Sequence, residues 1–322
     1  MTDEANSPSE EVEVFSPFTD SRTAIREFGE IALIESIREV LGENSPASPE
    51  GIGDDCAVWT PPPGERVLLT TDPVIFGKHF SENDAPEYVG GKLLKRNLSD
   101  IAAMGGNPGP ALLSLTMGPD VCRDWLMQFV YGLSMACEQF GVPLSGGDVA
   151  AGEPGTFVAT LTQTGSSAHP ITREGAQIHS PIYVTGALGG SLRGKHLHFL
   201  PRLAEGQWLA QQDNLCSMID ISDGLAKDLL QLIPHGAQAN LELDNIPLDQ
   251  NAETIEQAFC DGEDYELLFT LAPGAELQGW PFATPCQKIG HIRNTRGQGT
   301  LIDIASGKPL EFYHPGYEHF QG

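Results

Sequence analysis

Basic residues are scarce in this chain: 18 Lys and Arg stand against 44 Asp and Glu, so the formal net charge is −26 over 322 residues. This balance argues against a nucleic-acid partner, because no basic stripe is available to neutralise phosphates. An anionic small substrate would also be repelled unless metal ions lay between it and the protein. Much of the acidity is explained by a solvated surface, so the net charge alone assigns no function.

Paired cysteines and long apolar runs are also missing. The six cysteines are scattered without a CxxC spacing, which is typical of reduced thiols in a cytoplasmic protein. No apolar run approaches the roughly 20 residues that span a bilayer, so no membrane partner is expected. Residues 1–20 are polar and acidic and contain no apolar signal segment, which predicts a disordered tail. These features predict a cytoplasmic protein.

Several common catalytic motifs are absent. The sequence has neither a GxxxxGK(S/T) phosphate-binding loop nor the glycine-loop, HRD and DFG set of protein kinases. It also lacks the GxSxG and HExxH motifs. If ATP binds to this chain, we expect an unusual nucleotide site built from metal ions held by carboxylates.

Helix and strand patterns alternate along the chain and predict an α/β (α+β) fold of two mixed α/β domains. Helices are expected in the first half over 22–41, 86–104 and 123–140, and strands over 67–71, 111–117 and 156–164. A turn-rich junction follows near residue 168, after which strand and helix patterns alternate again. We therefore expect an acidic tail over 1–20, one domain over 21–168 and a second over 169–322.

Acidic motifs that follow or end apolar runs are the most informative feature present. They are Gly53-Asp54-Asp55, Thr70-Thr71-Asp72, Asn97-Leu98-Ser99-Asp100, Gly146-Gly147-Asp148 and Asp220-Ile221-Ser222-Asp223. Carboxylates beside core segments are costly unless a cation compensates them. Asp, Thr and Ser oxygens, without His or Cys at ligand spacing, suit hard cations such as Mg²⁺. We predict a site with several metal ions that handles phosphates.

Each motif also has a plain structural interpretation. The Asp55 motif could be a hairpin turn, Asp100 could lie on the polar face of its helix, and Asp148 could belong to a simple turn. Ser222 or Asp223 could merely cap the helix that follows, although a helix N-terminus can also receive phosphate oxygens.

Two further features have the same ambiguity. Glu263 lies in an acidic segment, Gly262-Glu263-Asp264-Tyr265-Glu266, which could be a turn before a strand or a substrate contact. His79 is a lone histidine, and such residues are more often structural than catalytic.

Taken together, the motifs resemble those of the thiamine-monophosphate kinase family, in the ATP-binding superfamily of aminoimidazole-ribonucleotide synthetase. The resemblance runs in order from about residue 25 to residue 320. It is carried by GIGDDCAV (51–58), TTDPVIFGKHF (70–80), NLSDIAAMGGNP (97–108), GGD (146–148), IDISDGLAKDL (219–229), GEDYELLFT (262–270) and GYEHF (316–320).

The resemblance implies an N-terminal α/β domain whose strands form a β-barrel across a homodimer, followed by a second α/β domain. It implies ATP-dependent phosphorylation of thiamine monophosphate to thiamine diphosphate, the last step of thiamine diphosphate biosynthesis, with several Mg²⁺ ions. The implied Mg²⁺ ligands are Asp55, Thr70, Thr71, Asp72, Asp100, Asp148, Asp220 and Asp223. The residues implied at ATP are Gly147, Asp148, Arg173 and Ser222, and those at the thiamine phosphate are His79, Glu263 and Tyr317.

Such a reaction needs no catalytic general base, because a phosphate monoester is already deprotonated near neutral pH. The difficulty is to bring several negative charges together in line, which metal ions solve by neutralising and orienting them. Arg173 is a sensible bidentate contact for phosphate.

The chain departs from the family pattern after Gly186, where a helical stretch is abbreviated. His198 and Phe199 stand where the family has Arg and Pro. Two other functions stay open at this stage: another ATP-dependent enzyme of the same superfamily, and a non-catalytic protein that binds MgATP.

Overall fold

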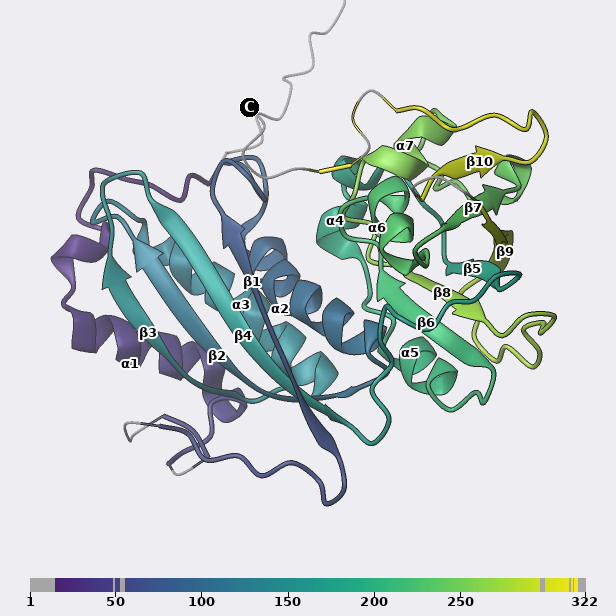
Figure 1. The fold of residues 1–322 in the computed structure, drawn as a ribbon. Coiled ribbons are helices and arrows are strands. Elements are labelled where there is room, and N and C mark those ends of the chain that lie inside the picture. The colour runs from purple at the N-terminus through teal and green to yellow at the C-terminus, as the bar shows by residue number, and fades with distance from the viewer. Residues whose placement is uncertain are drawn as a thin grey trace, which may run out of the picture.

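The computed structural model describes residues 15–48, 50–52, 56–295, 299–312, 314 and 316–317. These residues form two sheets, each with helices packed against it (Figure 1). The prediction of a mixed α/β fold is confirmed. In the described part of the chain, no helix is both long enough and apolar enough to cross a membrane.

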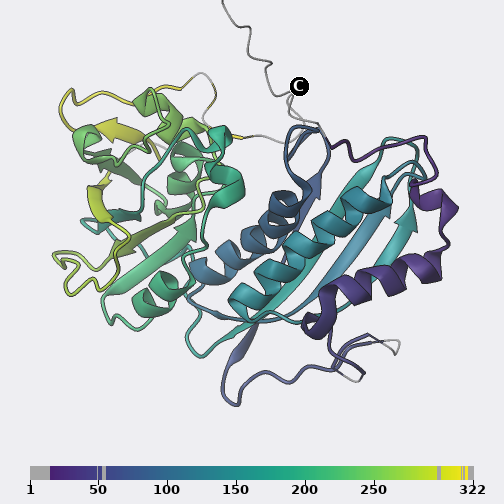
Figure 2. The same ribbon diagram turned by 180° about the vertical axis from the view of Figure 1, so that it is seen from behind.

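The first sheet has the strand order β1-β4-β2-β3, and its neighbours are antiparallel except for the parallel pair β2 and β3. Its strands are β1 (Arg66–Ile75), β2 (Asn107–Met117), β3 (Leu144–Ala151) and β4 (Phe157–Ser167). Three helices lie against one face, as Figure 2 shows: α1 (Glu30–Leu41), α2 (Pro86–Ala103) and α3 (Arg123–Phe140). Their apolar side chains, including Trp125 and Phe129, form one core with that face.

The opposite face of this sheet is not covered by any helix of the described residues (Figure 1). It carries exposed apolar side chains: Leu69 of β1 is 72% exposed, and Val67 and Leu112 are also exposed. Alternate residues of a strand share one face, so this surface, which we call the open sheet face, follows directly from the strand pattern.

The second sheet has the order β10-β7-β9-β5-β8-β6, in which only β10 and β7 are parallel. Its strands are β5 (Pro181–Thr185), β6 (Leu215–Asp220), β7 (Ala237–Leu241), β8 (Leu267–Leu271), β9 (Cys286–Asn294) and β10 (Leu301–Asp303). Its helices are α4 (Lys195–His198), α5 (Leu203–Leu209), α6 (Leu225–Leu232) and α7 (Ile255–Cys260). Short 3₁₀ helices span Ile25–Glu27, Gly42–Asn44, Ser191–Arg193 and Leu243–Asn245.

Helix α2 joins the two halves. Ala102 and Ala103 at its end share a core with Leu209 and Met218 of the second half. The approach is close at Gly206 of α5, where a Cβ atom would lie 2.1 Å from the carbonyl oxygen of Ala102. One face of α2 therefore points at the boundary between the halves.

The helix predicted over 22–41 begins only at Glu30. Residues before it pair instead with the segment that precedes α3: the Ile25 N–H donates to the Val121 carbonyl and the Arg26 N–H to that of Pro119. These tertiary hydrogen bonds replace the helical ones. Within the predicted tail, Phe18 forms a bridge with Val121.

The glycine pair of the GGD motif lies inside a strand and not at its end. Gly146, Gly147 and Asp148 pair with Leu112, Leu113 and Ser114 of β2. Hydrogen bonds to β2 outweigh the low strand propensity of glycine here. The residue pattern of this segment therefore did not predict strand β3. Strand β9 was missed as well.

Candidate active site

A pocket of about 260 Å³ lies between α2 and the second sheet. Its lining residues come from β1, α2, the end of β6 and later segments, so distant parts of the sequence meet there. They are Asp72, Lys78, His79, Arg96, Asp100, Leu192, Asp220, Ser222, Asp223, Asp261, Glu263, Tyr265 and Tyr317. We call this site the acidic pocket. It brings together many of the residues predicted from the separate motifs.

Three aspartates, Asp72, Asp100 and Asp220, form the deep part of the acidic pocket. The Thr70 hydroxyl donates to Asp100, and the Ser99 hydroxyl donates to Asp220 at 2.6 Å. Burial raises the pKa of Asp72 to about 6 and also raises that of Asp100. Burial, followed by the charge of Asp100, raises the pKa of Asp220 well above its usual value. Asp220 is therefore buried, Asp72 and Asp100 are half-buried, and the three carboxylates repel one another.

The donor chemistry of this group fits Mg²⁺, which prefers carboxylate and hydroxyl oxygens. Within the described residues, no three His, Cys, Asp or Glu side chains already converge on one ion position. The repulsion that raises the pKa of Asp220 is, however, the kind that a divalent cation relieves. Asp72, Asp100 and Asp220 are the carboxylates that could hold a metal ion here.

Thr71 does not lie at the acidic pocket. Its hydroxyl donates to the Leu161 carbonyl at 3.2 Å and lies 3.3 Å from the Thr162 hydroxyl. Strand alternation explains the difference, because Thr70 and Asp72 share one face of β1 while Thr71 lies on the other, the open sheet face.

Gly147 and Asp148 also lie away from the acidic pocket. Both line a larger pocket of about 740 Å³ beside β3, together with Ser114 and Thr162. The close approach of β2 requires glycine at 147, since a Cβ atom there would lie 1.9 Å from the Leu113 carbonyl oxygen. Thr71 pairs with Thr162 of β4, and Asp148 pairs with Ser114, which in turn pairs with Thr160 of β4. Thr160 and Thr162 share one face of β4, so Thr71 and Asp148 belong to the same side of the sheet.

Asp55 falls outside the described residues. Arg173 is described but is not among the residues that line the acidic pocket. The Arg173 guanidinium donates to the side chain of Gln231, yet it is near enough to Asp100 to lower the pKa of that carboxyl against the larger effect of burial. Arg173 thus lies at the margin of the acidic pocket.

Three N–H groups of the turn before α6 are satisfied by a residue of that helix. The N–H groups of Ser222, Asp223 and Gly224 all donate to Oδ2 of Asp228, at 3.0, 2.9 and 3.1 Å. Burial raises the pKa of Asp228 to about 7. Asp228 therefore occupies these three N–H groups, and the role of the helix N-terminus itself stays a prediction. What this turn does is present the Asp223 carboxylate, which lies 2.7 Å from Lys227.

Glu263 is held by a buried lysine from the other half of the chain. The Lys92 ammonium lies 2.8 Å from Glu263 and also donates to the His79 carbonyl at 2.9 Å. Burial works against the charged form of Glu263, but Lys92 outweighs it and holds the pKa of the carboxyl below its usual value. Glu263 is therefore an ionised carboxylate at the edge of the pocket, and the Tyr265 hydroxyl donates to it at 3.2 Å.

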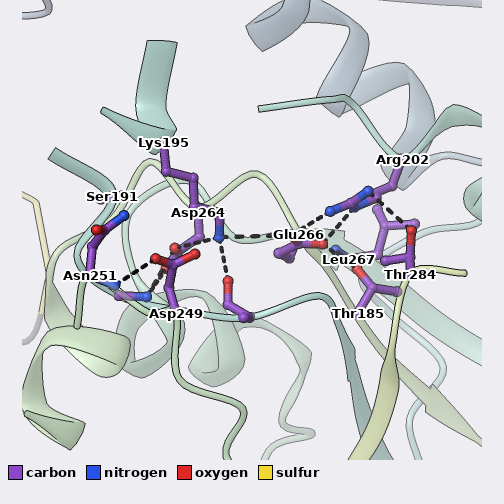
Figure 3. A network of polar contacts seen from close by, with 12 residues as sticks. Thr185, Ser191, Lys195, Arg202, Asp249, Asn251, Asp264, Glu266, Leu267 and Thr284 are labelled. Carbon is purple, nitrogen blue, oxygen red and sulfur yellow. Dashed lines mark hydrogen bonds and ion pairs between the residues drawn. The ribbon is translucent and has the colours of Figure 1, made fainter. Parts of the chain in front are cut away.

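Glu263 and Tyr265 have left-handed backbone conformations, with φ of 52° and 53°, which are uncommon for residues other than glycine. The side chains of Asp264 and Glu266 hold this segment in place, as Figure 3 shows. Glu266 accepts two hydrogen bonds of 2.7 Å from Arg202, and Asp264 accepts one of 3.0 Å from Lys195. The buried Asp264 and Glu266 thus anchor a strained segment that turns Glu263 and Tyr265 toward the pocket.

Of the two positions expected to depart from the family motif, Phe199 packs against this same segment and His198 packs against α2. Phe199 stacks on the Tyr265 ring with centroids 4.0 Å apart, and His198 contacts the Tyr88 ring at 4.3 Å. The Lys95 ammonium lies 5.0 Å from the centroid of Phe199. Both side chains are therefore held by aromatic contacts.

Sequence reasoning missed Lys92, Arg96 and Asp228. Arg96 lies 3.3 Å from Asp72 and donates to the Pro73 carbonyl. A signal was available, because Lys92, Arg96 and Asp100 are spaced four residues apart and such residues share one face of a helix. No comparable signal marked Asp228, whose role depends on the turn before α6.

This chain is similar to known proteins over most of its length. Residues 53–166 match the family described as AIR synthase related protein, N-terminal domain. The thiamine-monophosphate kinase of Rhodopirellula baltica is 33% identical over 289 residues, which cover 84% of this chain and 90% of that protein.

Solved structures give the same result. The thiamine-monophosphate kinase from Stenotrophomonas maltophilia has a TM-score of 0.69 and 27% identity, over 85% of this chain and 96% of that one. AaThiL complexed with AMPPCP and TMP has a TM-score of 0.70 and 27% identity, over 91% and 98% of the two chains. Because the similarity runs through both sheets, this chain belongs to the thiamine-monophosphate kinase family.

Proposed function

We propose that this protein transfers the γ-phosphoryl group of ATP to thiamine monophosphate and releases thiamine diphosphate and ADP. The observation that carries the proposal is the meeting, in one pocket, of the buried aspartates with the ionised Glu263. Family membership supports it, as does the relative whose structure holds AMPPCP and TMP.

The aspartates of the acidic pocket would hold Mg²⁺. Asp72, Asp100, Asp220 and Asp223 supply carboxylate oxygens there, and Thr70 adds a hydroxyl beside Asp100. When bound, Mg²⁺ would neutralise and orient phosphate groups that this pocket would otherwise repel. Several ions would fit the number of carboxylates better than one.

The other side of the pocket would receive thiamine monophosphate. Glu263, His79 and Tyr317 lie there, and Lys92 keeps Glu263 ionised at neutral pH. The thiazolium ring of thiamine is cationic, so an ionised carboxylate and the Tyr265 ring are suitable neighbours.

The transfer itself would be direct. An oxygen of the acceptor phosphate forms a bond to the γ-phosphorus while the bond from that phosphorus to the β-bridging oxygen breaks. No side chain has to remove a proton, since the attacking oxygen is already ionised. Positioning and charge neutralisation would supply the catalysis.

We also propose that the protein is a homodimer formed through the open sheet face. Exposed Leu69 and Leu112 on that face favour an apolar partner surface, and an equivalent sheet of a second copy would close the β-barrel. Gly147, Asp148 and Thr71 would then lie at the interface. The ATP site would consist of Gly147 and Asp148 together with Arg173 and Ser222. Residues 21–168 would be the dimerisation domain and 169–322 the second domain.

ATP as co-substrate and the unpaired cysteines of the described residues favour a cytoplasmic location. The test of function is a chromatographic assay of purified protein with MgATP and thiamine monophosphate, with and without EDTA. We expect thiamine diphosphate and equimolar ADP, both abolished by EDTA. A folded protein that binds MgATP and forms no product would overturn the proposal.

A further inference from the structure

Arg96 is a buried cation of the acidic pocket that none of the roles above uses. Two lysines close to the pocket carboxylates already have partners. Lys92 binds Glu263 and the His79 carbonyl, and Lys227 binds Asp223 and the Tyr317 carbonyl. Lys78 lines the pocket but is exposed. Arg96, by contrast, is only 13% exposed.

The guanidinium of Arg96 has unused donors. Of its five N–H groups, one on Nη1 donates to the Pro73 carbonyl, and one on Nη2 reaches Oδ1 of Asp72 at the long distance of 3.3 Å. Nε is shielded from solvent and has no hydrogen-bond partner among the described residues. A buried, charged donor without an acceptor is costly, so this side chain is prepared for a further anionic partner.

Arg96 lines the same pocket as the aspartates proposed for Mg²⁺ and the Glu263 carboxylate proposed for the acceptor. Its guanidinium lies 3.3 Å from Asp72. Burial raises the pKa of Asp72 and of Asp100, and the charge of Arg96 opposes both shifts. The same charge adds to the effect of Lys92 in holding down the pKa of Glu263 against burial.

We propose that Arg96 binds a phosphate oxygen at the junction between donor and acceptor. The planar guanidinium fork matches the geometry of phosphate, and phosphate can replace the long contact to Asp72. This inference rests on the proposed function for the identity of the ligands. The phosphate could be that of thiamine monophosphate or the γ-phosphate of ATP, and the chemistry of the contact is the same.

Calorimetry of the whole protein with Mg²⁺ separates these sources. The ligands are thiamine monophosphate, unphosphorylated thiamine and AMPPCP, and the variants are Arg96→Gln, which removes the charge, and Arg96→Lys, which keeps it without the fork. Arg123→Gln is the matched control, because Arg123 on α3 bonds to Ser36 away from the pocket. Thermal unfolding of each variant runs in parallel.

We expect Arg96→Gln to weaken binding of one phosphate ligand by about tenfold or more, with thiamine unaffected and Arg96→Lys intermediate. A selective loss for thiamine monophosphate assigns the contact to the acceptor, and one for AMPPCP assigns it to the donor. Unchanged affinities for both ligands in folded variants would overturn the proposal and leave Arg96 as a brace between β1 and α2. Because the measurement is binding, it is independent of whether the wild-type protein forms thiamine diphosphate.

Discussion

The Lys92 ammonium on α2 lies 2.8 Å from the carboxylate of Glu263, on the segment that leads into β8. Lys92 is fully buried. The pair crosses from one half of the chain to the other, and the same ammonium bonds to the His79 carbonyl beside the pocket. Lys92 therefore stabilises the contact between the two halves and also positions the residues proposed to bind thiamine monophosphate.

Replacing Lys92 with Met should destabilise the protein. The change leaves the Glu263 carboxylate buried without its cation, so we expect the free energy of unfolding to fall by about 3–5 kcal/mol and the KM for thiamine monophosphate to rise. Urea denaturation and steady-state kinetics measure the two effects. The double variant Lys92→Met, Glu263→Gln should recover part of the lost stability, and equal destabilisation in the single and double variants would count against this role.

Replacing Asp72 with Asn should remove activity without unfolding the protein. Asn keeps the shape but loses the charge that would hold Mg²⁺, so we expect turnover to fall on the order of 100-fold or more. Rates at several Mg²⁺ concentrations, with thermal unfolding as the folding control, are the measurement. We also expect a loss for Asp148→Asn, although Asp148 lies apart from Asp72, because Asp148 belongs to the ATP site proposed at the dimer interface. Near-normal rates at limiting Mg²⁺ would remove Asp72 from the metal site and Asp148 from the ATP site.

Replacing Leu69 with Glu should produce a monomer if the open sheet face is the dimer interface. A charge at the centre of an apolar interface is costly to bury, so sedimentation velocity should show half the wild-type mass, with loss of turnover. Ile31→Glu is a matched control, since Ile31 is 76% exposed on α1, on the helical side of the sheet. A Leu69→Glu variant with unchanged mass would contradict the interface.

The buried Asp264 should make stability depend on pH. Burial, opposed by Lys195, raises the pKa of Asp264 to about 7 from an ordinary value of 3.8. Between these values the folded protein holds a proton that the unfolded chain has released, so this contribution is present at low pH and is lost as pH rises toward 7. The loss is up to about 1.4 kcal/mol per pH unit.

In the Asp264→Asn variant the side chain at this position cannot ionise. The wild type should therefore lose unfolding free energy relative to the variant as pH rises from about 4 to 7. Above pH 7 the difference should level off. Urea denaturation at several pH values measures it, and a constant difference over this range would show that Asp264 is ionised throughout.

Much of the architecture was readable from local pattern. The apolar spacing of α2 and α3 and the β-branched run of β1 predicted those elements correctly, because helix and strand periods are local properties. The motifs around Asp72, Asp100 and Asp220 were identified for a similar reason, as carboxylates placed next to core segments. Strand alternation, which is also a local property, separates Thr71 from Thr70 and Asp72.

The residue types and their order along the chain therefore indicate the kind of chemistry: acidic oxygen ligands, few cations and a recognisable series of motifs. Which of these groups meet depends on how the chain packs. Lys92 reaches Glu263, Arg96 reaches Asp72, Asp228 satisfies the turn before α6, and Asp148 lies apart from the acidic pocket. Each of these depends on packing between segments distant in sequence, or on one backbone turn, and local propensity carries no information about either.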